Sequence, residues 1–505
     1  MKLFRSDQIK QIDEHTIKEE PVASIDLMER AAGQILIWYI QRFDRSKRIF
    51  IFAGPGNNGG DGLALARMLK SNRYEPVVCY IEFTEKTTED WKTNLLRLNK
   101  ESNVEIVYVK GTDQIPVISN SDVIIDAIFG TGLTRPAGGL AGDVIRFINL
   151  SRAAIISVDI PSGLFGEDNS SNNYETIISA DFTLSFQFPK LSFMFAENAP
   201  YLGEWIILPI GLNQNAVRNT LSPFVFLEKN DVAGILRKRN KFDHKGIFGH
   251  GLLVSGSYGK MGAAVIGAEA ALRTGIGLIT CHVPYCGVAV LQPSIPEAMV
   301  ISDQNEKHIS QVGTTDSYSA VGAGPGIGTE PETQRAIHDL LKECKKPMVI
   351  DADGLNILSL NPTWLAFLPE GTILTPHPKE FERLAGKSAD SYQRLTKQIE
   401  FAKDHRCIVI LKGANTSVAT PDGRVFFNST GNPGMAKAGS GDALTGIILS
   451  LLSQGYKPEE AAILGVYIHG LAGDIAVVES SYESIIATDI INNISKAFNK
   501  LREGQ

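Results

Sequence analysis

Short apolar runs alternate with amphipathic segments through the first 211 of the chain's 505 residues. Each run is continuous and rich in isoleucine and valine, which is typical of strands buried on both faces of a sheet. The amphipathic segments between the runs suit crossover helices, so the pattern predicts an α/β fold around a parallel sheet. The predicted strands cover residues 48–53, 76–81, 104–109, 123–129, 153–158, 182–186 and 205–208.

A second series of the same kind follows residues 211–224, which lack periodic apolar positions and contain Asn, Gln, Ser and Pro. We place a linker at residues 213–225, between domains of residues 1–212 and 226–505. A helix is predicted at residues 441–453, where leucine and isoleucine recur at helical spacing. The strands predicted in this half cover residues 250–255, 277–283, 319–322, 347–351, 372–375, 407–411, 416–419 and 425–428.

Composition narrows the class of protein. With 43% hydrophobic and 21% charged residues and a net charge of −7, the chain is typical of a globular protein that binds neither nucleic acid nor an anionic membrane surface. The five cysteines show neither zinc-ligand nor CxxC spacing, which favours buried thiols in a reducing compartment. We find no signal peptide and no apolar run near the ~20 residues of a membrane span, so we expect a cytoplasmic protein.

Three glycine-bearing polar segments follow predicted strands in the first half, at residues 57–61, 126–136 and 158–163. Open α/β sheets bind ligands at the carboxyl ends of their strands, and glycine loops let a phosphate-bearing ligand approach the backbone. Arg135 would add a cation, and we expect a helix to begin near Asp61 with this acidic residue in its first turn. Asp159 stands where Pro161 ends a strand, so it is a candidate general acid or base. Each segment alone has a structural explanation, but the three together favour a site.

The second half carries a comparable set of strand-end motifs. Asp442 follows Gly439, Ser440 and Gly441 at a predicted helix start, where free N–H groups can stabilise a transferring phosphoryl group and the carboxylate can accept a proton. Residues 412–416 follow another strand and are placed to bracket a nucleotide. Further loops lie at residues 322–328, 351–354 and 375–378, and the Walker GxxxxGK[ST] motif is absent from the sequence. A helix-capping role for Asp442 is the alternative interpretation.

The first-half segments AGPGNNGGDG, DAIFGTGLTRP and VDIPSG, together with LMERA at residues 27–31, resemble the YjeF N-terminal family of NAD(P)H-hydrate epimerases over about residues 1–211. The resemblance implies a Rossmann-like, three-layer αβα domain that interconverts the R and S hydrates of NADH and NADPH. It implies that Asp159 binds the hydrate and is the acid or base, and that K⁺ is held by Asn58, Asp126 and Ser162. A non-enzymatic binding module is the alternative for this fold. The implied hydrate contacts are Asn57, Asn58, Gly59, Gly60, Asp61, Gly130, Thr131, Gly132, Leu133, Thr134, Arg135, Pro136 and Asp159.

Residues 226–500 resemble the ribokinase-like superfamily and, more narrowly, the YjeF C-terminal family of nucleotide-dependent NAD(P)H-hydrate dehydratases. The motifs HKG, GAA, PEAM, AGPG, DADGLN, LTPHP and GNPGM carry the narrower resemblance, although Lys379 stands where a glycine is expected. It implies a second three-layer αβα domain in which Mg²⁺ accompanies ADP or ATP. The implied hydrate contacts are Ala263, Gly326, His377 and Asp442, and the implied nucleotide contacts are Lys412, Gly413, Ala414, Asn415, Thr416 and Gly441.

Together the two resemblances imply consecutive repair steps on one damaged cofactor. Epimerisation would supply the S hydrate, and Asp442 would take the proton from its C6 hydroxyl, so that the oxygen attacks the nucleotide's terminal phosphate. Loss of phosphate would then restore NAD(P)H and leave AMP from ADP, or ADP from ATP. A ribokinase-type small-molecule kinase would use Asp442 in the same way but release a stable phosphorylated product. The resemblances also lead us to expect a homo-oligomer, and they leave the choice between ADP and ATP open.

Overall fold

The computed structural model describes residues 1–20 and 22–503. These residues pack as two compact units, one of residues 2–20, 22–222 and 390–392, and one of residue 1, residues 223–389 and residues 393–503. The division at Ser222 and Pro223 falls inside the stretch that we interpreted as a linker. That stretch contains a helix that the sequence did not predict, α7 (Gln214–Asn219), whose N-cap Asn213 accepts hydrogen bonds from the N–H groups of Asn215 and Ala216. The polar residues that indicated a linker thus include a helix cap.

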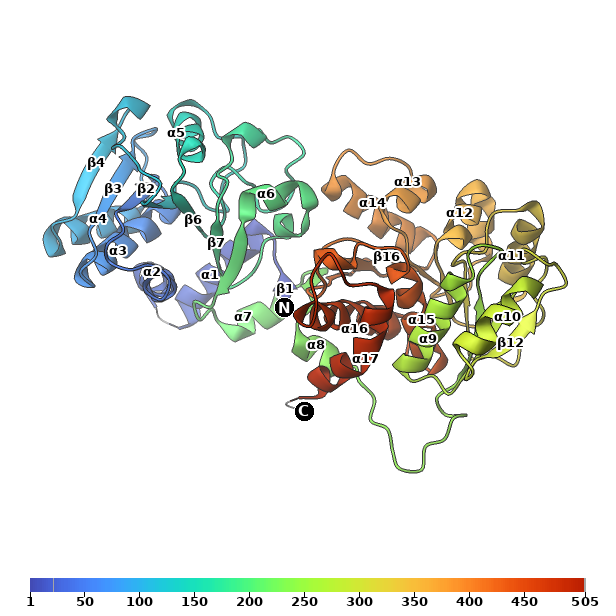
Figure 1. Cartoon of the computed structure of the whole chain (residues 1–505). Helices are drawn as coiled ribbons and strands as arrows, with labels where there is room; N and C mark the ends of the chain where they lie inside the picture. Colours follow the sequence, from blue (N-terminus) through green and yellow to red (C-terminus); the bar gives the residue numbers. More distant parts are fainter. Residues whose placement is uncertain (21, 504–505) are drawn as a thin grey trace. The chain divides into compact units, whose positions relative to one another are not determined.

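The first unit is built on a parallel seven-stranded sheet with the order β4-β3-β2-β5-β6-β7-β8 (Figure 1). All seven strands predicted from the apolar runs are confirmed, with bounds within two residues. They are β2 (Ile49–Ala53), β3 (Pro76–Ile81), β4 (Glu105–Val109), β5 (Val123–Ala127), β6 (Ala154–Val158), β7 (Phe182–Phe186) and β8 (Glu204–Leu208). The other elements described here are β1 (Lys2–Leu3), α1 (Ser6–Glu19), α2 (Ser24–Ile40), α3 (Asn57–Ser71), α4 (Glu89–Glu101), α5 (Gly139–Leu150) and α6 (Ala199–Leu202).

Helices cover both faces of this sheet, as the continuous apolar strands predict. Ile49 and Ile51 of β2 belong to one buried cluster, whereas Phe50 and Phe52 belong to another on the opposite face. The strand order reverses between β2 and β5, because the chain runs outward to β4 and then returns to the other side of β2. The crevice at such a reversal is the preferred ligand site of open α/β sheets, and two of the three glycine-bearing segments leave these two strands.

The start of α3 corrects one sequence expectation. The helix begins at Asn57 rather than near Asp61, so Asp61 lies in its second turn and not in the first. Asn and Gly have low helix propensity, which is why the sequence favoured a later start. The helix nevertheless begins four residues earlier and requires glycine in its first turn, since a Cβ on Gly59 would lie 1.8 Å from the carbonyl oxygen of Gly54. Only glycine fits where the turn packs this closely.

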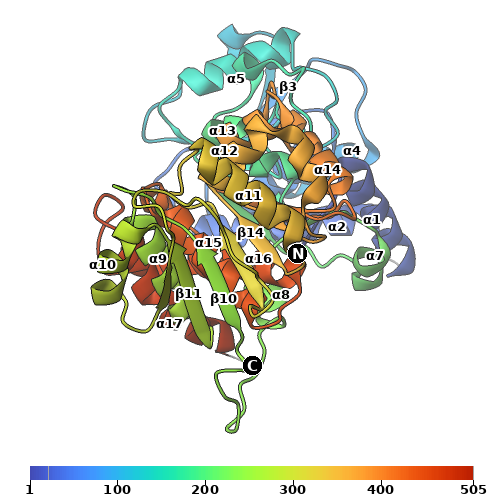
Figure 2. The ribbon, with the colours of Figure 1, turned by 90° about the vertical axis from the view of Figure 1, so that its right-hand side faces the viewer.

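The second unit holds a larger sheet in which the strands follow the order β9-β18-β17-β16-β15-β14-β13-β10-β11-β12. β17 is antiparallel to both of its neighbours, and the other pairs in this order are parallel. Figure 2 shows β10 and β11 side by side. The strands are β9 (Phe224–Phe226), β10 (His250–Val254), β11 (Leu278–Val283), β12 (Met299–Ser302), β13 (Ala320–Ala323), β14 (Met348–Ile350), β15 (Ile373–Leu374), β16 (Ile408–Leu411), β17 (Ser417–Ala419) and β18 (Val425–Phe427).

The eight strands predicted in this half are confirmed, and the sequence missed β9 and β12. Both are short strands without a fully buried residue, so neither produces a continuous buried apolar run. The strand order reverses again beside β10, which lies between β11 and β13. The helices are α8 (Lys229–Ala233), α9 (Gly262–Thr274), α10 (Tyr285–Ser294), α11 (Pro331–Glu343), α12 (Asp353–Leu360), α13 (Pro378–Ala385), α14 (Ser391–Asp404), α15 (Ser440–Ser453), α16 (Pro458–Val478) and α17 (Ala487–Arg502).

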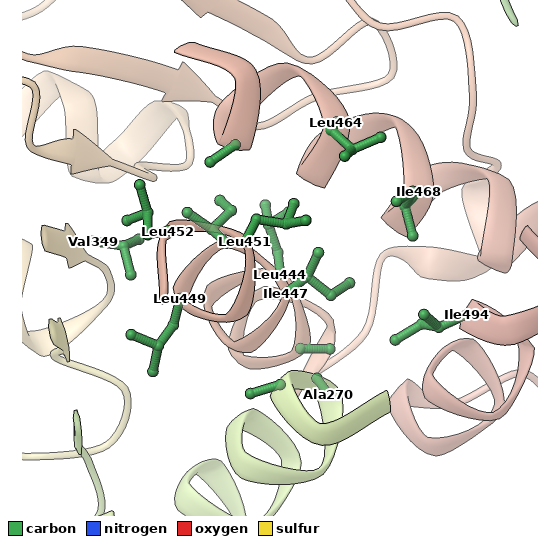
Figure 3. Close-up of a cluster of buried hydrophobic side chains, with 14 of the residues drawn as sticks. Ala270, Val349, Leu444, Ile447, Leu449, Leu451, Leu452, Leu464, Ile468 and Ile494 are labelled. Carbon is green, nitrogen blue, oxygen red and sulfur yellow. The ribbon is translucent and has the colours of Figure 1, made fainter. Parts of the chain in front are cut away.

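Helix α15 forms the centre of this unit's core. Its apolar side chains pack against Leu464 and Ile468 of α16, Ile494 of α17 and Val349 of β14 (Figure 3). Helix α16 has 21 residues and a mean hydropathy of 1.8, which is long and apolar enough for a membrane span. The expectation that no apolar run approaches this length was therefore wrong. Most of α16 is buried within the unit, as in the core helix of a globular domain.

Candidate functional sites

The glycine-bearing segments of the first unit meet where β2, β5 and β6 end. A Cβ on Gly54 would lie 2.0 Å from the carbonyl oxygen of Ile128, so the turn after β2 packs directly on the segment after β5. The Asn58 amide then joins the strand ends, because its Nδ2 donates to the carbonyl oxygens of Phe129 at 2.6 Å and Val158 at 3.1 Å. The structure thus brings the start of α3 together with the loops that follow β5 and β6.

A buried carboxylate and several oxygen atoms gather beneath this junction. Asp126 Oδ1 accepts from Ser162 Oγ at 2.5 Å, and its Oδ2 accepts from Ser162 N and Ser157 Oγ, both at 2.8 Å. Burial raises the pKa of Asp126, against the hydrogen bonds from Ser162 and Ser157. Asn58 Oδ1 is buried and accepts no hydrogen bond from the described residues. The three residues expected to hold a cation therefore lie together, with an unsatisfied amide oxygen among them.

Asp159 is held in an unusual backbone conformation beside this cluster. Its φ is +67°, a region that residues other than glycine adopt rarely and that is often found at functional sites. Its carboxylate Oδ1 accepts from Lys190 Nζ at 2.8 Å and from the N–H of Phe186 at 3.1 Å. Lys190 also donates to Ser185 Oγ at 3.1 Å and to the carbonyl oxygen of Phe188 at 3.2 Å. All of these bonds to the carboxylate go to Oδ1, which leaves Oδ2 for a ligand.

Two further carboxyl groups surround this ion pair. Burial raises the pKa of Asp13 to about 7, with a further rise from Asp159 and an opposing effect of Lys190. Burial also raises the pKa of Asp61, and Asp159 and Asp13 add to the rise. The side chain of Asp61 is buried, which agrees with a structural or positioning role. Sequence reasoning missed Asp13 and Lys190, although Lys190 follows the neighbouring strand β7 closely enough to have been suspected.

The loop that leads from β5 to α5 forms the outer part of this region. A Cβ on Gly130 would lie 3.4 Å from Asn58 Nδ2, so the loop starts at the buried cluster. Arg135 is exposed and forms no ion pair with the residues that the structure describes. The start of the loop therefore lies at the buried cluster, whereas the rest of the loop is exposed or half-buried. These remaining residues are Thr131, Gly132, Leu133, Thr134, Arg135 and Pro136.

The second unit has a cavity of about 740 Å³ that most of the predicted nucleotide contacts line. Asn415 and Asp442 do not line it, and neither do Ala263 and Gly326. The last two are neighbours, because a Cβ on Gly326 would lie 3.1 Å from Ala263 Cβ. The predicted residues in the lining are His377, Lys412, Gly413, Ala414, Thr416 and Gly441.

Asp442 lies in the first turn of α15. Gly439 precedes the helix with a φ of +88°, a conformation that favours glycine, so the chain can turn sharply into the helix. Burial raises the pKa of Asp442 to about 6; Asp351 and Asp353 add to this rise, and Lys412 opposes it. A carboxylate that titrates near neutral pH is suited to act as a general base.

Two histidines lie at this cavity. His377 caps α13, since its Nδ1 accepts from the N–H of Glu380 at 3.2 Å, and it also lines the cavity. Lys379, found where a glycine was expected, lies within the first turn of α13, so the local backbone is helical. His469 Nε2 lies 3.2 Å from Ser440 Oγ, and burial lowers its pKa to about 4, which makes it neutral at pH 7. Sequence reasoning missed His469, which lies within the long apolar helix α16.

Family models match both units. Residues 24–192 match a model described as the YjeF-related protein N-terminus, and residues 251–496 match one described as NAD(P)H-hydrate dehydratase. The first contains the strand ends around Asp159, and the second contains the cavity and Asp442.

Two relatives and one solved structure agree with these family models. The chain is 34% identical to the bifunctional NAD(P)H-hydrate repair enzyme of Moorella thermoacetica, over 100% of this chain and 98% of that protein. It is 35% identical to the enzyme of the same name from Thermofilum pendens, over 100% of this chain and 97% of that protein. A ribokinase-like superfamily protein from Enterococcus faecalis has a TM-score of 0.50 and 26% identity, covering 56% of this chain and 98% of its own.

Proposed function

The chain belongs to the family of bifunctional NAD(P)H-hydrate repair enzymes, and we propose specific roles for its residues in the two reactions. Its first unit is the epimerase and its second unit is the ADP- or ATP-dependent dehydratase. The relatives are named as repair enzymes, which favours this function over a kinase that releases a phosphorylated product.

In the epimerase site Asp159 is the acid or base that exchanges protons with the hydrate. Lys190 holds one carboxylate oxygen at 2.8 Å, so the carboxylate is fixed in place and its other oxygen is directed at the substrate. The start of α3 and the loop after β5 supply backbone N–H groups and glycine surfaces for the dinucleotide. The hydrate contacts that we propose are Asn57 to Asp61, Gly130 to Pro136, and Asp159.

We assign K⁺ to the cluster of Asn58, Asp126 and Ser162. Hard cations prefer amide, carboxylate, hydroxyl and carbonyl oxygens, and Asn58 Oδ1 is a buried acceptor that a cation would satisfy. Bound K⁺ would supply positive charge beside the strand ends where the dinucleotide is held. K⁺ in place of tetramethylammonium should raise the melting temperature of the chain, and Asp126→Asn should remove that difference. An equal melting temperature in both salts would exclude the assignment.

In the dehydratase site Asp442 accepts the proton of the C6 hydroxyl. The hydroxyl oxygen then forms a bond to the terminal phosphorus of ADP or ATP, and the bond from that phosphorus to the remaining nucleotide breaks. Phosphate leaves with the C6–O bond electrons as the ring nitrogen donates its electron pair. Loss of a C5 proton completes the double bond of the dihydronicotinamide.

The nucleotide is held by Lys412 to Thr416 and by Gly441, and the hydrate by Ala263, Gly326, His377 and Asp442. Mg²⁺ would reach the site with the nucleotide, because this ion binds substrate phosphates and needs few protein ligands.

The position of Asp442 supports this assignment, since a carboxylate with a pKa of about 6 lies in the first turn of α15, whose Ser440 and Gly441 line the nucleotide cavity. Asp442→Ala should abolish the return of dihydronicotinamide absorbance from S hydrate with ADP or ATP. The same variant should still interconvert R and S hydrates, and an unchanged melting temperature would show that the second unit is folded. Full dehydration by Asp442→Ala would refute the assignment.

We also propose that the enzyme is cytoplasmic and assembles as a homo-oligomer. Four of its five cysteines are buried and none forms a disulfide, as suits a reducing compartment. Light scattering of the purified chain measures the oligomeric state directly, and a monomer would exclude the second proposal.

A further inference from the structure

We propose that Asp351 is a positioning residue of the dehydratase, which fixes Lys412 where the ammonium meets the nucleotide phosphates. The proposal rests on the nucleotide-binding role given above to Lys412. It adds a residue that touches neither nucleotide nor hydrate but determines where the binding cation lies.

The Asp351 carboxylate accepts hydrogen bonds from three parts of the unit. It directly follows β14, and its Oδ1 accepts from Lys412 Nζ, at the end of β16, at 2.9 Å and from the N–H of Ala352 at 2.8 Å. Its Oδ2 accepts from Thr445 Oγ1 of α15 at 2.9 Å. Only 2% of the Asp351 side chain is exposed, so the carboxylate is buried and satisfied within the protein.

The two members of this ion pair differ in their access to the cavity. Lys412 lines the cavity with 24% of its side chain exposed, whereas Asp351 does not line it. A Cβ on Gly441 would lie 3.3 Å from Lys412 Nζ and 3.4 Å from Asp351 Oδ2. The pair therefore packs against the first turn of α15, where a phosphate would also meet free helix N–H groups. Asp351 acts on the ligand through Lys412.

Glu380 pairs with Lys412 less closely than Asp351 does. Glu380 Oε2 lies 4.0 Å from Lys412 Nζ, beyond hydrogen-bond distance. The same oxygen accepts from the N–H of His377 at 2.8 Å, in the cap of α13. Without Asp351 the flexible lysine chain would lose its hydrogen-bonded carboxylate and keep only the 4.0 Å ion pair with Glu380, so its ammonium would be held less firmly.

The backbone after β14 supports the same conclusion. Ala352 has a φ of +49° and a ψ of −118°, a conformation that is strained for a residue with a side chain. A Cβ on Gly324 would lie 1.9 Å from the carbonyl oxygen of Asp351, so the neighbouring loop packs tightly on this turn. Surrounding structure thus holds Asp351 in place at the cost of local strain, as is common where a side chain must be aimed.

The charge of Asp351 also reaches the proposed base. Asp351 and Asp353 both raise the pKa of Asp442, and Lys412 lowers it. Lys260 faces Asp353 at 3.3 Å, and Glu380 faces Lys412 at 4.0 Å. Removing the Asp351 charge takes away one source of the rise and also frees the positive charge of Lys412. Both changes lower the pKa at which Asp442 loses its proton.

The test is Asp351→Asn in the full chain, assayed for both activities. We expect the KM for ADP and ATP to rise about tenfold or more, because a charged hydrogen-bond partner of Lys412 is lost. The acid limb of the dehydratase pH profile should move to lower pH, which a change in packing alone would not cause. Asp339→Asn, an exposed charge change on α11 of the same unit, should alter neither. Unchanged KM and an unchanged acid limb in Asp351→Asn would overturn the proposal.

Thr445→Val keeps the test decisive if Asp351→Asn folds poorly, and a double variant tests the path through Lys412 if Asp351→Asn folds. Thr445→Val removes one donor to Asp351 but keeps its charge, so the KM should rise severalfold without a shift of the acid limb; an unchanged KM would count against the proposal. Asp351→Asn added to Lys412→Gln should raise the KM little further, since Asp351 acts through that lysine. A full additional rise would contradict this. An unaffected KM in Lys412→Gln alone would instead refute the nucleotide-binding role of Lys412.

Discussion

The two units each contain a lysine–aspartate pair at the carboxyl ends of their strands, but the partners exchange roles. In the epimerase Lys190 is 2% exposed and Asp159 is 16% exposed, with 2.8 Å between the charged atoms. In the dehydratase Asp351 is 2% exposed and Lys412 is 24% exposed, with 2.9 Å between them. In the roles that we propose, the buried member is the support in each pair, and the more exposed member faces the ligand.

This difference follows from the chemistry that each site needs. Epimerisation requires an acid or base at the reacting carbon, so the carboxylate is the exposed member and a lysine supports it. Transfer of a phosphoryl group requires a cation at the phosphates, so the lysine is the exposed member and a carboxylate supports it. The base that we propose for the dehydratase, Asp442, is then a separate residue on α15.

The largest effect on activity is expected from removing Asp159, the more exposed member of the pair in the epimerase. Asp159→Ala should slow R/S interconversion by about 10²–10⁴-fold, the usual contribution of general acid–base catalysis. Dehydration of pure S hydrate should be unchanged, because that site lies in the other unit. The measurement is chromatography of the two epimers beside the absorbance assay. Loss of both activities in a folded variant would show that the units do not work independently.

Removing Lys190, the buried member of the epimerase pair, should lower the free energy of unfolding as well as the rate of epimerisation. Lys190→Met leaves Asp159 without its cation, and breaking a buried ion pair costs about 3–5 kcal/mol of unfolding free energy. Epimerisation should fall together with this stability, since Oδ1 is no longer held. The matched control is Lys110→Met, an exposed lysine of the same unit, for which a change within about 0.5 kcal/mol is expected. Full epimerase activity in a destabilised Lys190→Met would mean that the pair serves folding alone.

The pH dependence of the dehydratase tests how its base differs from an ordinary aspartate. Burial and Asp351 disfavour the ionised form of Asp442, whose pKa is raised to about 6. A general base must be ionised, so kcat/KM should fall about tenfold per pH unit below pH 6 and level off above it. Circular dichroism over the same range checks that the chain stays folded. A flat rate between pH 7 and pH 5 would exclude Asp442 as the base with this pKa.

Sequence patterns predicted the sheets well because buried parallel strands are continuous apolar runs. The seven strands of the first unit and eight strands of the second followed from those runs, whereas the short, partly exposed β9 and β12 did not. The start of α3 was misplaced because Asn and Gly have low helix propensity, whereas the tight turn before α3 requires glycine at position 59.

The supporting residues were the harder part to predict. Lys190 lies 31 residues after Asp159 and meets it only because β7 pairs with β6. Asp351 lies 61 residues before Lys412, and several strands of the sheet bring them together. The sequence analysis noted the loop at residues 351–354 but not the pairing of Asp351 with Lys412, because the partner of a buried charge depends on strand order. For the same reason Asp159 was a candidate from the sequence and its partner Lys190 was not.

The smallest effect on activity is expected where the Lys412–Asp351 pair contacts the first turn of α15. In Gly441→Ala the new methyl group would lie 3.3 Å from Lys412 Nζ and 3.4 Å from Asp351 Oδ2, so the pair must move by a few tenths of an ångström. Alanine is the better helix former by about 1 kcal/mol, and this gain offsets much of the cost of the tight contact. The free energy of unfolding should therefore be nearly unchanged. The KM for the nucleotide should still rise about fivefold, because overpacking costs about 1–3 kcal/mol at a tight contact. Gly313→Ala, where the methyl group would meet nothing within 4 Å, is the matched control. If both variants gave the same KM, the position of Lys412 would not depend on its contact with the first turn of α15, and the two pairs would differ more than their geometry indicates.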